Sequence, residues 1–236
     1  VSVCFATNGE YASEADAAVR AAESRSVLAA LGVPAEQIYF LGYPDTGMPY
    51  EESFLRRLYD GCRVSASRWG RTETWRPDGQ DFHFMRSGCH GTYTAASVLR
   101  DLSDVLALVN PDTVYVTAPG DCHGDHDALG RFTTQAVAAM ENPPALYYYL
   151  IHADRTDIWP ERDAERFHLP PMAADHPLLR CAAERRPLPD GFSPAEKYSL
   201  IQSYTSQDPA AYNGYLLAFA KNDELVFRVE RLPSRT

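Results

Sequence analysis

The chain has 236 residues, 45% of them hydrophobic and 23% charged, which is enough apolar sequence for one large domain with a sizeable core. Its formal net charge of −10 argues against a nucleic-acid partner, which would require a basic face. No apolar run approaches the ~20 residues that cross a bilayer, so no transmembrane segment is predicted. The sequence begins at Val1 with neither an initiator Met nor a leader, so it leaves the cellular compartment open, and it does not indicate the oligomeric state.

Strand and helix patterns alternate along most of the chain. Short apolar runs rich in β-branched and aromatic residues predict strands at 1–6, 37–41, 114–118, 145–151 and 224–229. Apolar residues at helical spacing, together with capping and stop signals, predict helices at 13–31, 51–59, 94–109, 127–140, 194–204 and 206–220. This order is typical of an α/β fold with a doubly wound, mostly parallel sheet.

Two stretches without periodicity, 61–91 and 152–192, interrupt this pattern as long loop excursions of a single domain that spans 1–236. Trp69 and Trp75 in the first stretch either stack on a sugar ring or anchor the loop to the body of the domain. The second stretch is rich in proline and charge. Its histidines are predicted to be structural: His152, His168 and His176.

The five cysteines show no CxxC spacing, so a structural zinc site is not predicted. Cys4 lies in an apolar strand and is expected to be a small buried hydrophobe. Cys62 and Cys89 flank a polar loop and would be able to pair in an exported protein, a question that the sequence leaves open.

Polar residues crowd directly after the strand at 114–118. Residues 119–126 read PGDCHGDH, so two histidines and two aspartates fall within six positions just before a helix begins. A loop at the carboxyl end of such a strand opens into the crevice where open α/β sheets bind ligands. Imidazole and carboxylate groups packed this closely suit a divalent metal, with His126 as a ligand and Asp125 as a carboxylate that supports it. The alternative is a solvated turn in which Asp125 or Asp127 caps the helix.

Four segments form a set of motifs in chain order. Arg20 and Glu23 form an R-x-x-E pattern in a helix that ends in LGV, and residues 40–45 read FLGYPD. Residues 121–126 read DCHGDH, and Lys197 is followed by Ser206, Gln207 and Glu224. Together these segments resemble the R-x-x-E helix, the FLG-x-PD loop, the D-x-H-x-DH motif and the C-terminal signature of the LmbE/PIG-L family of metal-dependent de-N-acetylases.

The resemblance implies a Rossmann-like fold and a zinc hydrolase that removes acetyl from N-acetylglucosamine-type sugars or glycoconjugates. In that family, zinc is held by a His and an Asp of an H-P-D-D motif and by the last His of D-x-H-x-DH, and the spare Asp is the general base. By resemblance, His126 would be the metal ligand and His123 would lie beside the developing oxyanion. A protonated His123 would there stabilise that anion or deliver a proton to the departing amine. Asp125 would orient the loop or its histidine, and Arg20 and Asp45 match positions near the sugar pocket.

The chain departs from the family because it contains no H-P-D-D segment. In the family this segment lies on a strand immediately upstream of the part that 1–10 matches. That strand would be central in the sheet, between the strands near Val1 and Val114, and a sheet that lacks it leaves backbone groups unpaired. We therefore expect the natural polypeptide to extend upstream, and residues 1–236 alone to form an N-terminally truncated domain without activity.

Three functions remain open on this basis. The first is a zinc-dependent de-N-acetylase acting on an N-acetylglucosamine-type or related N-acyl compound. The second is a family member that has lost its metal site and binds a sugar or serves as a scaffold. The third, a nucleotide-binding Rossmann protein, lacks support because no G-x-G-x-x-G follows any predicted strand.

Overall fold

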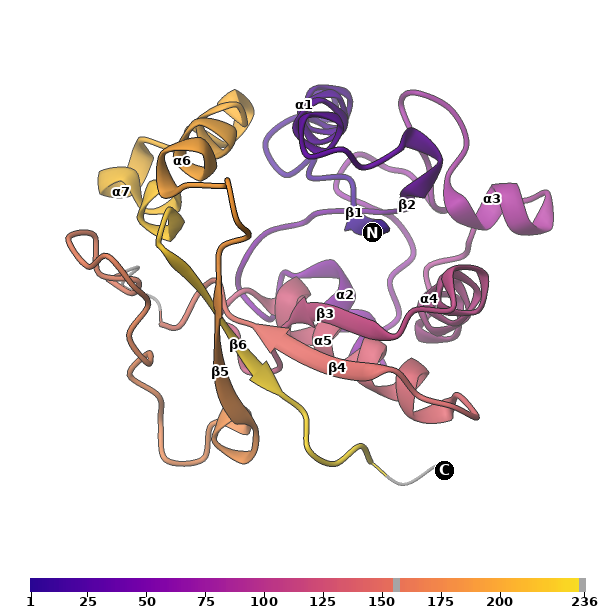
Figure 1. Cartoon of the computed structure of the whole chain (residues 1–236). Coiled ribbons are helices and arrows are strands. Elements are labelled where there is room, and N and C mark those ends of the chain that lie inside the picture. The colour runs from indigo at the N-terminus through magenta and orange to yellow at the C-terminus, as the bar shows by residue number, and fades with distance from the viewer. Residues whose placement is uncertain (155–157, 234–236) are drawn as a thin grey trace.

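A computed structural model gives the fold of residues 1–154 and 158–233 (Figure 1). The strands of this part of the chain are β1 (Val3–Thr7), β2 (Ile38–Tyr43), β3 (Thr113–Thr117), β4 (Ala145–Tyr149), β5 (Ala182–Pro187) and β6 (Asp223–Arg228). Its α-helices are α1 (Asp16–Ala30), α2 (Phe54–Tyr59), α3 (Phe82–Ser87), α4 (Ala95–Val109), α5 (Gly124–Ala139), α6 (Pro194–Gln202) and α7 (Ala211–Gly214). Short 3₁₀ helices are η1 (Ala35–Gln37), η2 (Pro177–Arg180), η3 (Thr205–Gln207) and η4 (Leu216–Phe219).

The strands form two sheets, where a single sheet was expected. β1 and β2 make a parallel pair, and the second sheet has the order β3-β4-β6-β5. In it β3 and β4 are parallel, whereas β6 runs antiparallel to both β4 and β5. The parallel strands confirm the predicted α/β class. Within the described residues no ladder joins β1 to β3, the two strands between which the sequence analysis placed a missing strand, so the Rossmann-like arrangement stays a prediction.

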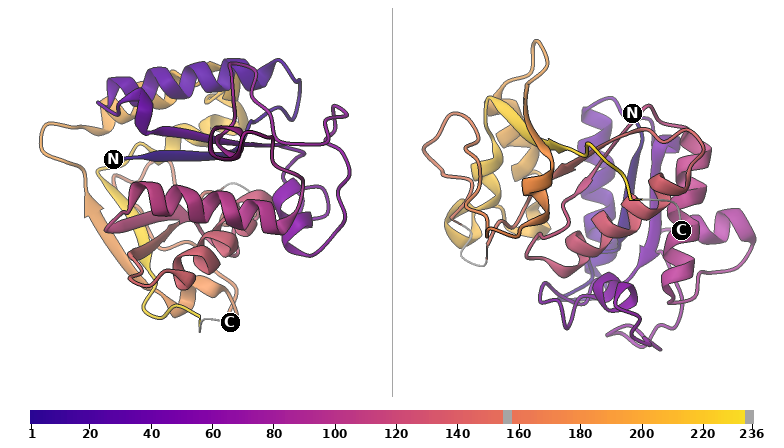
Figure 2. Two further views of the ribbon diagram at one scale, coloured as in Figure 1. Left: turned by 90° about the vertical axis from the view of Figure 1, so that its right-hand side faces the viewer. Right: turned by 90° about the horizontal axis from the view of Figure 1, so that it is seen from below.

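Helices cover both faces of the β1–β2 pair. Side chains of β2 alternate between these two faces, so the strand contacts the helices on each side. Ile38 and Phe40 pack with Ala21 of α1, whereas Leu41 and Tyr43 belong to the large apolar cluster on the other face. That cluster includes buried side chains of α2, α4 and α5, and Figure 2 shows α1 and α4 on opposite sides of the pair. The residues of α4 that were predicted to face the core are buried or half-buried against it: Ala95, Val98, Leu99, Leu102, Leu106 and Val109.

Helix α5 approaches the end of β3 closely. A Cβ atom on Gly130 would lie 2.4 Å from the carbonyl oxygen of Thr117 and 2.8 Å from Cδ of Pro119, so only glycine permits this contact. The close approach holds the first turn of α5 against the carboxyl end of β3, and the polar loop 118–123 runs between them.

Both predicted loop excursions contain regular structure that the sequence analysis did not predict, and the first of them, 61–91, includes helix α3. In 61–91, Trp75 is buried beneath the guanidinium of Arg71, and the indole N–H of Trp69 donates to the carbonyl of Glu10 at 2.8 Å. Both tryptophans therefore anchor this loop to the body of the domain.

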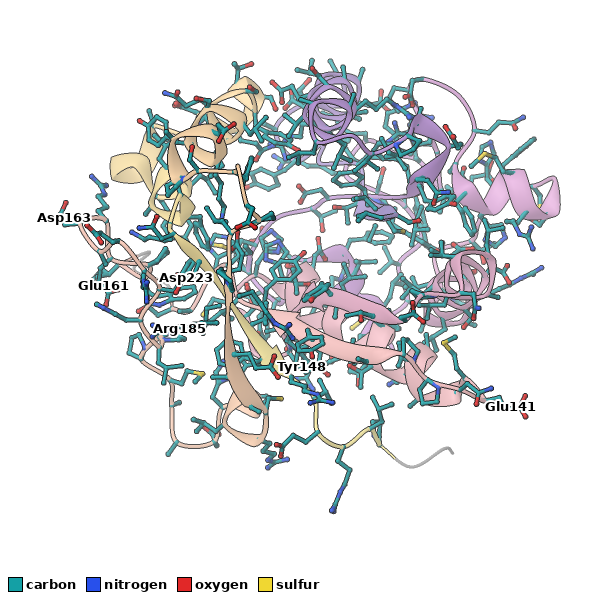
Figure 3. The ribbon with its side chains drawn as sticks, viewed as in Figure 1. Glu141, Tyr148, Glu161, Asp163, Arg185 and Asp223 are labelled. Atoms are coloured by element: carbon teal, nitrogen blue, oxygen red, sulfur yellow. The ribbon has the colours of Figure 1, made fainter. Side chains whose placement is uncertain are left out.

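The prediction of a surface excursion over the whole of 152–192 is wrong, because β5 lies within this stretch and pairs with β6 along six residues. The carboxylate of Asp223, at the start of β6 and labelled in Figure 3, also accepts from the backbone N–H of Phe167 at 3.0 Å. Strand β5 reads AAERRP and has four exposed residues, so it lacks the apolar pattern by which strands are predicted.

Tyr147 and Tyr148 are buried, as the prediction of strand core requires, while Tyr149 is 36% exposed. None of the five cysteines, all of which lie in the described part of the chain, forms a disulfide, and the pair considered above, Cys62 and Cys89, is exposed. None of the described helices is both long and apolar enough to cross a membrane.

Candidate active site

The carboxyl ends of the parallel-paired strands supply the residues of the candidate site. Glu10 follows β1, Asp45 follows β2 and His152 follows β4, while the loop 118–123 and the first turn of α5 follow β3. This is the edge at which open α/β sheets bind ligands.

Asp121 organises the loop after β3. Its side chain is fully buried, and its Oδ1 accepts from the backbone N–H of His123 at 2.9 Å and lies 3.3 Å from Nδ1 of His126. Its Oδ2 accepts from the backbone N–H groups of Ile151 and His152 at 2.9 and 3.0 Å, which fixes the end of β4 to the loop. Burial raises the pKa of Asp121, but the contacts with His126 and the backbone outweigh it, and the net pKa is lowered.

His126 therefore has a carboxylate behind its ring. With Nδ1 directed at Asp121, Nε2 is the nitrogen that remains for a ligand, which is the arrangement that orients metal-binding imidazoles in proteins. The side chain as a whole is 28% exposed. The orienting carboxylate is Asp121 and not Asp125, the residue proposed from sequence.

His123 is the N-cap of α5. Its Nδ1 accepts from the backbone N–H of Asp125 at 3.2 Å, so in this tautomer the ring proton is on Nε2. Burial, together with the neighbouring His126 and His152, lowers the pKa of His123 to about 3. The protonated imidazole expected from sequence is thus disfavoured, because its Nδ1 would lose its acceptor role and its charge would be buried. The neutral ring still presents one N–H donor.

A third imidazole completes the cluster. The ring centroid of His152 lies 5.6 Å from that of His126 and 6.0 Å from that of His123, while His123 and His126 stack at 4.4 Å. His152 also stacks on Tyr215, with ring centroids 5.4 Å apart. Sequence reasoning missed His152 at this site because it lies 26 positions from His126 and is joined to the loop by backbone contacts with Asp121 and Cys122.

Asp125 points away from the histidines. It is buried, and its Oδ1 accepts from the backbone N–H of Leu55 at 2.7 Å, so it attaches the first turn of α2 to α5. Burial, reinforced by the negative charge of Asp45, raises the pKa of Asp125 well above its ordinary value. Gly124 beside it leaves room for Ser53, since a Cβ there would lie 2.5 Å from the Ser53 hydroxyl oxygen.

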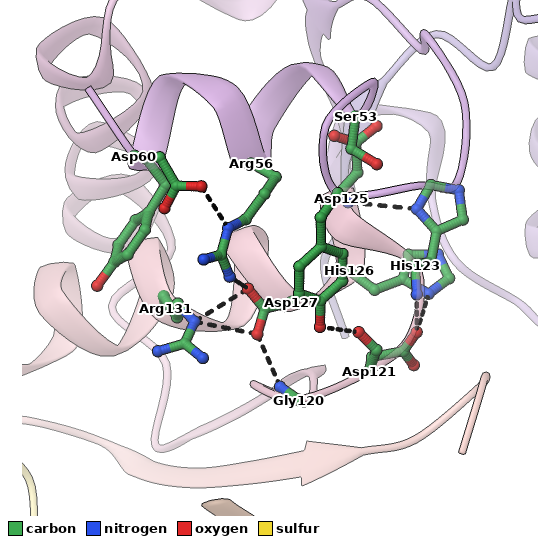
Figure 4. A network of polar contacts seen from close by, with 12 residues as sticks. Ser53, Arg56, Asp60, Gly120, Asp121, His123, Asp125, His126, Asp127 and Arg131 are labelled. Atoms are coloured by element: carbon green, nitrogen blue, oxygen red, sulfur yellow. Dashed lines mark hydrogen bonds and ion pairs between the residues drawn. The ribbon is translucent and has the colours of Figure 1, made fainter. Parts of the chain in front are cut away.

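Asp127 forms a separate ionic network beneath the loop, shown in Figure 4. Its buried carboxylate pairs with Arg56 of α2 and, at 3.0 Å, with Arg131 of α5. Its Oδ1 also accepts from the backbone N–H of Gly120 at 2.7 Å. The predicted alternative of a simple helix cap is therefore wrong for Asp127, which links two helices to the turn that precedes Asp121.

The opposite wall of the site carries Glu10, Asp45 and Arg20. The backbone N–H of Asp45 donates to Oε2 of Glu10 at 3.2 Å, and the Asp45 carboxylate pairs with the Arg20 guanidinium at 3.8 Å. Burial raises the pKa of Asp45, and the hydrogen bond from the Gly47 backbone N–H and the charges of Arg20 and His126 oppose this effect. Burial also raises the pKa of Glu10 to about 7.

Glu10 was missed by sequence reasoning. The signal that points to it is a fully buried carboxyl group directly after a strand, with a pKa close to neutrality, and functional sites are rich in such groups.

Arg20 is held from a second direction by the C-terminal part of the chain. With its amide oriented to match, Gln207 accepts from Nε of Arg20 at 2.7 Å. Three residues along α1, Glu23 accepts from the Thr205 hydroxyl at 2.7 Å and from the Ser206 backbone N–H at 2.9 Å. The R-x-x-E and Ser-Gln motifs thus meet in space.

The residues present do not complete a zinc site by themselves. Structural and catalytic zinc sites use at least three protein ligands at about 2.0–2.3 Å. Across residues 1–154 and 158–233, no group of three His, Cys, Asp or Glu side chains converges in this way. His126, with its oriented ring, is a suitable single donor, but the described donor set does not fit a resident metal ion without further ligands.

Fold and site together define an α/β protein with imidazoles and carboxylates at the carboxyl edge of its parallel strands, an arrangement suited to acid–base chemistry on a small molecule. The family model PIG-L, described as GlcNAc-PI de-N-acetylase, matches residues 1–137. Because this match covers more than half of the chain, the protein belongs to the PIG-L family, whose members are deacetylases and are typically metal-dependent. No curated protein and no solved structure gives a significant match.

Proposed function

We propose that this protein hydrolyses the N-acetyl amide of an N-acetylglucosamine-type sugar or glycoconjugate and releases acetate. The observation that carries the proposal is the stacked His123–His126 pair on the loop after β3, in a chain of the PIG-L family. The facing wall of Arg20 and Asp45 offers a guanidinium and a carboxylate 3.8 Å apart, which suits hydrogen bonding to sugar hydroxyl groups.

His123 and Glu10 have distinct roles in this proposal. His123 presents its Nε2–H to the oxyanion that forms on the amide carbonyl, because its Nδ1 is occupied by the Asp125 backbone N–H. Removal of one such donor typically costs a factor of about 100–1,000 in rate. Glu10, buried and with a pKa of about 7, is suited to holding or moving a proton near neutral pH.

Zinc is part of the proposal, with His126 as its ligand in this chain. With further ligands to complete its site, a bound zinc ion would polarise the amide carbonyl and activate a water molecule. Asp121 would hold the His126 ring through Nδ1 and leave Nε2 for the metal, and that would be the contribution of the described residues to the site. We also predict that residues 1–236 alone hydrolyse no amide, because the described donor set is incomplete.

The experiment uses the protein expressed from its own gene. Zinc content and acetate release from methyl N-acetyl-β-D-glucosaminide are measured on the same preparation. About one equivalent of zinc with acetate release supports the hydrolase. If the protein binds the glycoside in a calorimeter but releases no acetate at any zinc concentration, the second candidate, a sugar-binding family member without catalysis, replaces it.

A further inference from the structure

Four aromatic rings from three separate segments of the chain stack in one column beside the loop after β3. The rings of His123 and His126 stack with their centroids 4.4 Å apart, and His152 continues the column 5.6 Å from His126. Tyr215, between α7 and η4, follows at 5.4 Å from His152, with the two ring planes inclined by 18°. Stacked rings at such distances attract each other beyond the effect of their burial. The column therefore joins the site histidines to the C-terminal part of the chain.

Tyr215 also reaches His126 by a second route, through the backbone. The Tyr215 hydroxyl donates to the carbonyl of Ile151, and the N–H of Ile151 donates to Oδ2 of Asp121 at 2.9 Å. Oδ1 of Asp121 lies 3.3 Å from Nδ1 of His126 (Figure 4). Since Ile151 and His152 are successive residues, the hydroxyl and the ring of one tyrosine hold both of the segments that bear on His126.

Tyr215 is itself fixed by the interior of the domain. It is 5% exposed, and Phe219 packs edge-on against it at 5.7 Å. Phe219 packs in turn on Trp159 and Phe167, which are both buried. Side chains packed this closely keep one position. His126, in the first turn of α5, is 28% exposed, so the column connects a rigid aromatic cluster to a less restrained imidazole.

The restraint matters because a catalytic group acts only within a narrow range of positions, and a displacement of about 1 Å typically costs a factor of about 100 in rate. The contact with Asp121 restrains Nδ1 of His126 but leaves the ring free to tilt about that nitrogen. Stacking of His152 on the face of the ring opposes this tilt. Support of this kind, from residues that do not touch the substrate, is what keeps functional sites in their productive geometry.

We propose that Tyr215 is a positioning residue of the candidate active site and holds the His126 ring in place through His152 and Ile151. The proposal rests on the proposed function and extends it beyond the family core, because Tyr215, Ile151 and His152 all lie outside residues 1–137, which the family model matches. Tyr215 touches no substrate in this proposal. It raises the fraction of molecules in which His126 is correctly placed, so its removal should lower kcat.

The test is acetate release from methyl N-acetyl-β-D-glucosaminide by the protein expressed from its own gene. Tyr215→Leu removes the ring and the hydroxyl, and kcat should fall about 100-fold. KM should stay within about twofold, because Arg20 and Asp45 on the opposite wall would bind the sugar as before. Tyr198→Leu, at a 40% exposed position of α6, is the matched control and should leave kcat unchanged. A folded Tyr215→Leu that keeps the full kcat, or loses rate through KM alone, overturns the proposal.

Two substitutions of His152 keep the test decisive if Tyr215→Leu fails to fold. His152→Ala interrupts the column and leaves the buried tyrosine in place, and kcat should again fall about 100-fold. His152→Phe retains a planar ring and should restore most of that loss. If His152→Phe is no faster than His152→Ala, a stacked ring is not what supports His126, and the proposal is wrong.

Proton NMR of the same preparations gives a reading that does not depend on activity. Stacked aromatic rings shift each other's proton resonances, so the Cε1–H signals of His126 and His152 report on the column at a single pH. The corresponding alanine variants assign these two signals. Both should move in Tyr215→Leu and stay in place in Tyr198→Leu. A His126 signal that is unchanged in Tyr215→Leu contradicts the proposal.

The two measurements also separate this inference from the proposed function. If the unaltered protein releases acetate and Tyr215→Leu releases it at the same rate, the hydrolase stands and the positioning role fails. If the His126 signal moves as expected but the unaltered protein releases no acetate, Tyr215 still positions the ring and the de-N-acetylase fails.

Discussion

The carboxylate of Glu23 on α1 accepts hydrogen bonds from both the backbone N–H and the hydroxyl of Ser206, which lies 183 positions further along the chain. Ser206 lies outside the segment 1–137 that the family model matches, whereas Glu23 lies inside it. The contact therefore joins the C-terminal part to the family core, and through the neighbouring pair of Arg20 and Gln207 it also fixes a wall of the candidate site.

Removal of the Glu23 carboxylate should weaken the attachment of the segment around Ser206 to α1. Glu23→Ala deletes three hydrogen bonds to a charged acceptor that is partly exposed, and we expect a loss of about 1–2 kcal/mol in the free energy of unfolding. Urea denaturation measures the loss. The control is Glu36→Ala, an exposed glutamate in η1, which should change stability by less than about 0.5 kcal/mol. Equal effects of the two substitutions would contradict this role for Glu23.

Gly9 should prove necessary for the position of Arg20. Gly9 has φ of +73°, and a Cβ there would lie 2.6 Å from Cδ of Arg20, so Gly9→Ala displaces the guanidinium from Asp45. Gly32 is a matched control because its φ is +77° and a Cβ there meets nothing within 4 Å. Both variants should lose about 1–2 kcal/mol of stability from backbone strain. Weaker binding of methyl N-acetyl-β-D-glucosaminide, by about tenfold, is expected in Gly9→Ala alone.

Substitution of Asp127 should lower the free energy of unfolding more than most single substitutions. Its side chain is fully buried between two arginines, and Asp127→Ala leaves Arg56 and Arg131 as adjacent like charges, so the expected loss is about 3 kcal/mol. Asp104 pairs with Arg100 at 3.9 Å on the surface of α4, and Asp104→Ala should cost about 0.5 kcal/mol or less. Thermal denaturation of the two variants at one pH compares them; similar shifts would show that the Asp127 network is not structural.

Some features of the fold and of the candidate site were predictable because they depend on residues close together in the sequence. The spacing of Val98, Leu102 and Leu106 on α4 fixed one apolar face, and PGDCHGDH after a strand indicated the site loop. By contrast, the partners of Asp121, the third imidazole of His152 and the strand β5 depend on contacts between distant segments. β5 carries charged, exposed side chains and is stabilised by its ladder with β6, so it leaves no hydrophobic pattern in the sequence.

The buried carboxyl group of Glu10 predicts a dependence of stability on pH. Burial raises its pKa from about 4.5 in the unfolded chain to about 7 in the folded protein. Between these values the folded protein holds a proton that the unfolded chain has lost, so stability falls as pH rises through this window. Glu10→Gln retains an oxygen for the Asp45 N–H but does not ionise. It should match the unaltered protein below pH 4.5 and exceed its stability at pH 8 by roughly 3 kcal/mol.

The control for Glu10 is the exposed Glu141, labelled in Figure 3. Glu141→Gln should give the same stability profile as the unaltered protein at every pH. If Glu10→Gln also follows that profile up to pH 8, the carboxyl group of Glu10 does not have the raised pKa on which its proposed role near neutral pH depends.

The most direct test of the central claim is the rate of acetate release from methyl N-acetyl-β-D-glucosaminide by the protein expressed from its own gene, with zinc supplied. We expect His126→Ala to abolish zinc binding and acetate release, and His123→Ala to retain zinc but lose a factor of about 100–1,000 or more in rate. His168→Ala removes a histidine whose side chain is 62% exposed, and it should leave the rate unchanged. Full activity in both His123→Ala and His126→Ala would contradict the assignment of this loop as the active site.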